Sequence, residues 1–152
     1  MGTHSLIIMR VKDNSNKYTI YSVLYQQFDG DLSYVGKKLC SFLKRITITN
    51  GIEIKLVNGK IVREDNIANG PGCLFAQIIK LFKTETGGAY ICEPSDNDLE
   101  EYNYYVDVIE NQCRITLMNN DNVLFRGNAS DALTYISQID QTSQISQTAN
   151  DE

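Results

Sequence analysis

The sequence has few of the residues that catalysis and metal binding use most often. Its 152 residues include one histidine (His4), no tryptophan and only two prolines. The four cysteines are far apart and form no Cys-X-X-Cys pair, and a single histidine cannot complete a Cys/His zinc set. We therefore expect four reduced, mostly buried thiols, no bound metal and no cofactor.

Long apolar runs and an excess of basic residues are also missing. No run of about 18 apolar residues occurs, so we expect no membrane-spanning helix. No charged start leads into an apolar segment, which predicts a cytoplasmic protein. The net charge of -5 disfavours duplex nucleic acid as a partner. Most Lys and Arg residues fall within the first 63 positions, which is compatible with a small basic pocket there.

The pattern of apolar residues predicts an α+β fold. Strands are expected at residues 6–11, 18–27, 89–93, 102–109, 112–118 and 123–126, and helices at 33–46, 71–86 and 130–139. Because the strands gather at the two ends of the chain, they predict a mainly antiparallel sheet with two or three helices packed on it.

We expect a single domain over residues 1–138. Two Asn-Gly pairs, at residues 50–51 and 58–59, predict a hairpin insertion within residues 47–63. Residues 139–152 are rich in Ser, Gln, Thr and Asn, so we expect a disordered polar tail.

The first glycine-rich segment, residues 25–30 with 35–38, joins a strand to a helix. Backbone N–H groups at such a helix start attract anions, above all phosphate. The same glycines also suit a tight, capped turn, so the pattern alone leaves both interpretations open. The candidate ligand-binding residues here are Tyr25, Gln27, Asp29, Gly30, Gly36 and Lys37.

The second glycine-rich segment, residues 68–73, also leads into a helix. It lacks the Lys-Ser/Thr pair of a phosphate-binding Walker loop. Asn69, Gly70 and Gln77 are ligand-binding candidates. Cys73 stands at the helix start, where a thiol becomes more acidic and can act as a nucleophile. It could equally be a small residue that lets the helix approach the sheet.

Two charged or polar residues near the first strand complete the candidate set. Arg10 interrupts an apolar strand, so it either points to solvent or lines a pocket on the sheet face near Tyr21 and Tyr25, and ordinary packing within the sheet is the third interpretation. His4 precedes the same strand and could contact a ligand or serve as a base.

Several segments in combination resemble a known pattern. They are residues 1–6 (MGTHSL), 25–30 (YQQFDG) with 35–37 (VGK), 68–77 (ANGPGCLFAQ), and 87–90 (GGAY) with 101–106 (EYNYYV). The combination resembles a family of small, largely uncharacterised proteins from phages, large DNA viruses and some microbes. The chain departs from that pattern at His4 and Gln26, where arginine is usual, and at Asp31-Leu32, which replaces Tyr-Pro.

Three functions follow as hypotheses. The resemblance implies a viral or phage accessory protein, and the glycine-rich segments would then form one pocket that sequesters a phosphorylated nucleotide immune signal. Alternatively, Cys73 is the nucleophile of a hydrolase, with His4 or Asp29 as its base. The third hypothesis is a protein-interaction module that uses an exposed strand edge. A homodimer or higher homo-oligomer is compatible with each.

Overall fold

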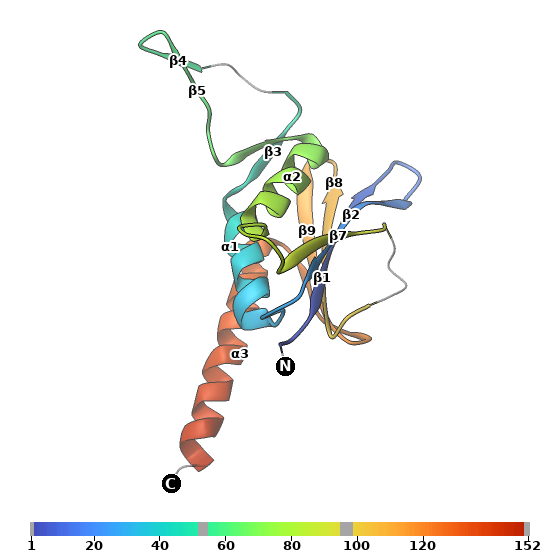
Figure 1. Cartoon of the computed structure of the whole chain (residues 1–152), viewed down its shortest axis with the longest axis vertical. Coiled ribbons are helices and arrows are strands. Elements are labelled where there is room, and N and C mark those ends of the chain that lie inside the picture. Colours follow the sequence, from blue (N-terminus) through green and yellow to red (C-terminus); the bar gives the residue numbers. More distant parts are fainter. Residues whose placement is uncertain (1, 52–54, 95–98, 151–152) are drawn as a thin grey trace.

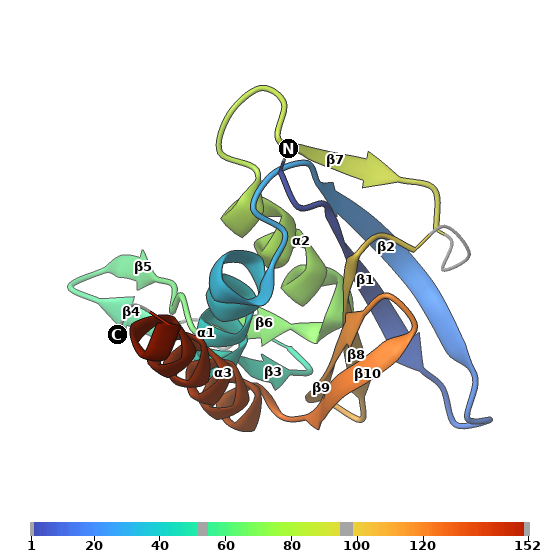
Figure 2. The same cartoon turned by 90° about the horizontal axis from the view of Figure 1, so that it is seen from below.

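A computed structural model of the chain describes the backbone of residues 2–51, 55–94 and 99–150. A six-stranded, mainly antiparallel sheet carries helices on one face, and together they form a single domain (Figures 1 and 2). The α+β class predicted from the sequence is confirmed.

Six strands make up the main sheet in the order β10-β9-β8-β1-β2-β7. Their bounds are Ser5–Lys12 (β1), Tyr18–Gln26 (β2), Ala89–Cys92 (β7), Tyr102–Ile109 (β8), Gln112–Asn119 (β9) and Asn122–Gly127 (β10). Neighbouring strands run antiparallel except β1 and β8, which are parallel.

The apolar run in β1 is explained by its central position. Ile7 and Met9 pack into the core beneath the helices, while Leu6 and Ile8 belong to a second cluster on the opposite face. Because β1 is covered on both faces, its sequence shows no alternation of polar and apolar residues.

Three α-helices cover one face of the sheet, and the first of them follows a turn of π-helix. The π turn η1 (Leu32–Gly36) leads directly into α1 (Lys37–Arg45), and α2 (Gly70–Phe82) and α3 (Ala129–Asn150) follow later in the chain. Asp31 caps the start of η1, because its carboxylate accepts the Tyr34 N–H at 3.1 Å. Helix α2 ends at Phe82, earlier than predicted.

Two small two-stranded sheets lie between α1 and α2. Strands β3 (Thr47–Thr49) and β6 (Ile67–Asn69) pair in parallel, which the sequence did not predict. Strands β4 (Lys55–Val57) and β5 (Lys60–Val62) form the expected hairpin around Asn58-Gly59, and both turn residues have positive φ. This hairpin, here called the arm, extends away from the sheet and helices (Figure 1). Residues 52–54, which belong to the expected hairpin insertion, lie outside the described part.

Helix α3 continues to Asn150, where we expected a disordered tail from residue 139. No glycine or proline interrupts residues 129–150. The hydroxyl groups of Thr142 and Ser146 donate to carbonyl groups four residues earlier, so these polar residues stay within the helix. Within the described residues, no helix combines the length and apolarity needed to span a bilayer.

Candidate functional site

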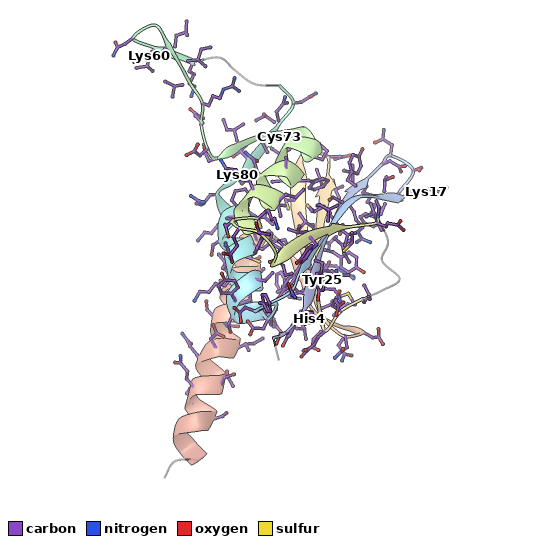
Figure 3. All side chains as sticks on the ribbon, in the orientation of Figure 1. His4, Lys17, Tyr25, Lys60, Cys73 and Lys80 are labelled. Carbon is purple, nitrogen blue, oxygen red and sulfur yellow. The ribbon has the colours of Figure 1, made fainter. Side chains whose placement is uncertain are left out.

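The two glycine-rich segments lie at opposite ends of α2. The first leaves the end of β2, where Gln27 N–H donates to Gly88 O at 2.8 Å. The carboxyl end of α2 also lies beside the end of β2. Lys83, which follows α2, donates from Nζ to Gly87 O and Ala89 O, on either side of the Gly88 that bonds to Gln27. The second segment begins α2, whose 13 residues separate the two by about 20 Å. In Figure 3, Cys73 lies far from His4 and Tyr25.

The expected single cleft around Gly30, Gly36, Asn69 and Gly70 is therefore not formed. Helix α2 runs from one glycine-rich segment back toward the other, and its length keeps them apart. The predicted ligand-binding residues divide into an amino-terminal group and a group at the start of α2.

In the amino-terminal group, Gly30 is buried and serves close packing. A Cβ placed there would stand 2.7 Å from Ser5 Cβ and 2.8 Å from the His4 carbonyl carbon. Its N–H donates to Thr3 O at 2.8 Å, and its carbonyl accepts the Tyr104 hydroxyl at 2.7 Å. This backbone is already bonded, so Gly30 does not offer the free N–H group that phosphate binding requires.

Gly36 has a similar role one turn later. A Cβ there would approach Tyr104 Cε1 at 3.2 Å and Ile136 Cδ1 at 3.3 Å. The Gly36 N–H donates to Asp31 O. Lys37, which follows it, is exposed. The structure thus favours the capped, tightly packed turn over an anion site at this end.

His4 and Tyr25 contact each other at the same end of the sheet. Tyr25 Oη lies 2.8 Å from His4 Nδ1, and the rings meet edge to face. Desolvation, followed by the nearby Glu100 carboxylate, raises the pKa of Tyr25. Asp29 lies in the adjoining turn at φ 53°, exposed to solvent. None of these residues lines the cleft described next.

A large cleft lies between the arm and helices α1 and α2, with a volume of about 1120 Å³. Helix α2 contributes Cys73, Gln77 and Lys80, and Asn69 lies just before it. The β5–β6 connection contributes Arg63. The remaining lining residues used below are Phe42, Arg45, Gly51, Lys55, Val62, Glu64, Asp65, Ile67 and Leu81.

Cations predominate among the charged groups of this arm cleft. Lys55 forms an ion pair with Glu64. Arg45, Arg63 and Lys80 are exposed, and within the described part of the chain none of them pairs with a carboxylate. Asp65 is the remaining acidic lining residue. The described residues that line the cleft therefore carry a net positive charge, although the protein as a whole is acidic.

Two amide side chains organise the wall at the start of α2. Asn69 Oδ1 accepts the Gly51 N–H at 2.8 Å, so it fixes the neighbouring loop and does not cap the helix. Gln77 Nε2 donates to Ile67 O at 3.0 Å, whereas its Oε1 atom is buried without a hydrogen-bond partner. An acceptor that is buried without a partner costs free energy, and this atom has no surface open to the cleft.

Cys73 lines the arm cleft, half-buried in the first turns of α2. The bases that we expected to activate it, His4 and Asp29, do not line this cleft, so the predicted pairing is not formed. The carboxylates of the cleft are Glu64 and Asp65. Among the described residues, no group of three or more His, Cys, Asp or Glu side chains is placed to hold a metal ion.

Arg10, the remaining predicted site residue, lies on the sheet face opposite the helices. It is bonded to Asp107 and flanked by tyrosine rings, so it packs within the sheet and is not part of the cleft.

The cationic residues Arg45, Arg63 and Lys80 were not among those predicted from the sequence. One signal was present: Asn69, Cys73, Gln77 and Lys80 recur at helical spacing, which places them on one side of α2. The contribution of the arm could not be predicted, because it depends on where the hairpin lies relative to the helices.

Comparison with known proteins gives no further identification: no family model, no curated protein and no solved structure matches this chain.

Proposed function

We propose that this protein binds a small phosphorylated molecule in the arm cleft. The observation that carries the proposal is the convergence of three cations, Arg45, Arg63 and Lys80, on a cleft of about 1120 Å³, where none of them pairs with a carboxylate of the described residues. Arginine and lysine side chains at such positions bind phosphate oxygens by charge-assisted hydrogen bonds.

The other walls favour a ligand with a planar, hydrogen-bonding part, such as a nucleotide. Small-molecule sites combine apolar walls with a few polar groups that fix orientation, and volumes of roughly 300–1000 Å³ are typical. Phe42 and Leu81 provide apolar surface, and the amide side chains of Asn69 and Gln77 lie in the cleft wall.

Holding the ligand without altering it is the role we favour. The resemblance to phage and viral proteins supports one form of this role, the sequestration of a nucleotide signal. The half-buried thiol of Cys73 in the same cleft supports the alternative, a hydrolase, with Glu64 or Asp65 in place of the bases predicted from the sequence.

The test uses the purified chain and a panel of cyclic and linear nucleotides. The protein is mixed with each nucleotide, freed of unbound material, denatured, and the released compounds are analysed by mass spectrometry. Release of an intact nucleotide is the expected result. Release of an altered nucleotide would support the enzyme alternative, and release of none would exclude nucleotides as the ligand.

A further inference from the structure

The sheet face opposite the helices has an apolar part and a charged part. The α-helices gather on the other face (Figures 1 and 2). In the apolar part, Leu6, Ile8 and Tyr105 are buried, and Leu99 of the β7–β8 connection packs against their cluster. The charged part begins at Arg10, two residues after Ile8 on β1.

The six strands of the main sheet contain four basic residues, and all four lie on this face. Arg10 and Lys12 both contact the Tyr18 ring, with the guanidinium carbon 4.1 Å and the ammonium nitrogen 5.5 Å from its centre. Arg114 of β9 lies directly opposite Asp107, which bonds to Arg10. Because paired residues point to the same side of a sheet, Arg114 shares this face.

The fourth basic residue, Arg126, comes from the edge strand β10. It lies opposite Thr116, two residues after Arg114 on β9, and its Nε donates to Thr116 Oγ1 at 3.4 Å. Diagonal neighbours of this kind are about 7–8 Å apart, and Arg114 lies two strands, about 10 Å, from β1. Lys12, Arg114 and Arg126 therefore form a diagonal row across the sheet, and we call them the sheet-face cations.

Acidic groups do not neutralise this row. Asp107 is the one acidic residue within the six strands, and both its carboxylate oxygens accept from Arg10. Asp13 and Glu110 lie in turns beyond the strand ends. In the part of the chain that the structure describes, none of the sheet-face cations forms an ion pair. The face is thus positive in a chain whose net charge is -5.

The chemistry of this face fits a linear polyanion that carries aromatic groups. Single-stranded nucleic acids bind to surfaces where cations follow the backbone and aromatic side chains stack on bases, and sheet faces can provide both. Tyr18 stands at the end of the row, opposite Lys12 on β2, and 40% of its surface is exposed. We propose that a single-stranded nucleic acid crosses this face, with phosphates on the sheet-face cations and a base against Tyr18.

A double helix fits the same face less well. It carries one charge per roughly 1.7 Å of its axis, against one per roughly 3.4 Å for each strand, so the acidic chain repels it more strongly. Its bases also remain paired, so none can stack on Tyr18. None of the sheet-face cations lines the arm cleft, so this site and the proposed nucleotide site are independent.

The test measures fluorescence anisotropy of labelled strands of about 12 nucleotides, one of RNA and one of DNA, with the full chain at several salt concentrations. Binding of either strand is expected, and the tighter one identifies the natural class. Three phosphate contacts predict a slope of about -2 for the logarithm of the association constant against the logarithm of salt concentration.

Two kinds of variant separate the roles on this face. The double variant Arg114→Gln/Arg126→Gln removes two exposed cations, so it should bind at least about 10-fold more weakly, with a slope shallower by about 1.4. Tyr18→Leu should bind about 5-fold or more weakly with the slope unchanged, because stacking releases no counterions. Lys80→Glu in the arm cleft changes the net charge by the same two units as the double variant and should bind nearly as the wild type does.

Any of four results would overturn the proposal. They are a wild type that binds neither strand at low salt, a duplex or polyglutamate that binds as tightly as the single strand, a double variant that keeps wild-type affinity, and a Lys80→Glu variant that loses as much affinity as the double variant. Urea unfolding establishes that each variant is folded. If Tyr18→Leu fails to fold, the comparison of single strand with duplex decides whether bases take part.

Discussion

Arg10 and Asp107 form a two-point ion pair on the sheet face opposite the helices. Arg10 Nε lies 2.7 Å from Asp107 Oδ1, and Arg10 Nη2 lies 2.9 Å from Oδ2. The guanidinium carbon also stands 4.1 Å from the centre of the Tyr18 ring and 4.3 Å from that of Tyr105. The arginine that interrupts the apolar sequence of β1 therefore joins three neighbouring strands.

Replacing Asp107 by Asn should destabilise the fold. Breaking a fully buried ion pair by removing one partner costs about 3–5 kcal/mol. Because the Arg10 side chain retains 18% exposure while Asp107 retains 3%, we expect about 2–3 kcal/mol, measured by urea unfolding. Arg10→Met should also lose stability but bind nucleotide as the wild type does. A loss of binding in a folded Arg10→Met protein would contradict the placement of Arg10 outside the site.

Gly30 and Gly72 provide a matched pair for the roles of the two glycine-rich segments. Gly30→Ala should lose about 1–3 kcal/mol, because the added methyl group would collide with Ser5 and the His4 backbone. Gly72→Ala should gain about 0.5–1 kcal/mol, since it lies in α2 with no atom near the new Cβ. Chemical denaturation of both variants checks this. Equal stability of the two would show that Gly30 is not tightly packed.

The fold was largely predictable because its elements have strong local signals. Asn58-Gly59 determined the hairpin turn, and the unbroken apolar run around Ile8 indicated a strand covered on both faces. Pairing between distant strands gave no such signal. The parallel pairing of β3 with β6 unites segments about 20 residues apart through three residues each, too few to produce a periodicity.

The site was predicted less well, for a physical reason. A glycine-rich segment before a helix looks the same in sequence whether its N–H groups are free or bonded. At Gly30 the partner is Thr3 O, which comes from a different part of the chain. Of the predicted residues at the start of α2, Asn69, Cys73 and Gln77 line the cleft, because helical spacing places them on one side. Gly70, which was predicted with them, does not line it.

Cys40 should react far more slowly than Cys73 with a thiol-alkylating reagent. Burial raises the pKa of the Cys40 thiol from 9.0 to about 12, whereas Cys73 lines the open cleft. Peptide mass mapping after timed alkylation should therefore find Cys73 modified first and Cys40 modified only when the protein unfolds. Bound nucleotide should protect Cys73. Early modification of Cys40 in the folded protein would contradict its burial.

The buried Cys40 thiol should make the stability of the fold sensitive to alkaline pH. In the unfolded chain Cys40 loses its proton near pH 9, but in the folded protein only near pH 12. The folded state therefore holds the proton more tightly, and this contribution to stability is complete below pH 9 and lost as the pH rises toward 12. The decline in the urea midpoint above pH 9 should be smaller in Cys40→Val than in the wild type. An identical decline in both proteins would count against this assignment.

Reversing one charge in the arm cleft should weaken nucleotide binding. Lys80→Glu removes a cation of the α2 wall and adds a carboxylate that repels phosphate. A hydrogen bond to a charged group is worth about 1.5–3 kcal/mol, so we expect the dissociation constant to rise by roughly 10- to 100-fold in calorimetric titrations. Lys44→Glu on α1 makes the same charge change outside this cleft, and it should leave affinity nearly unchanged at moderate ionic strength. Equal losses in the two variants would mean that net charge attracts the ligand and that the arm cleft does not hold it.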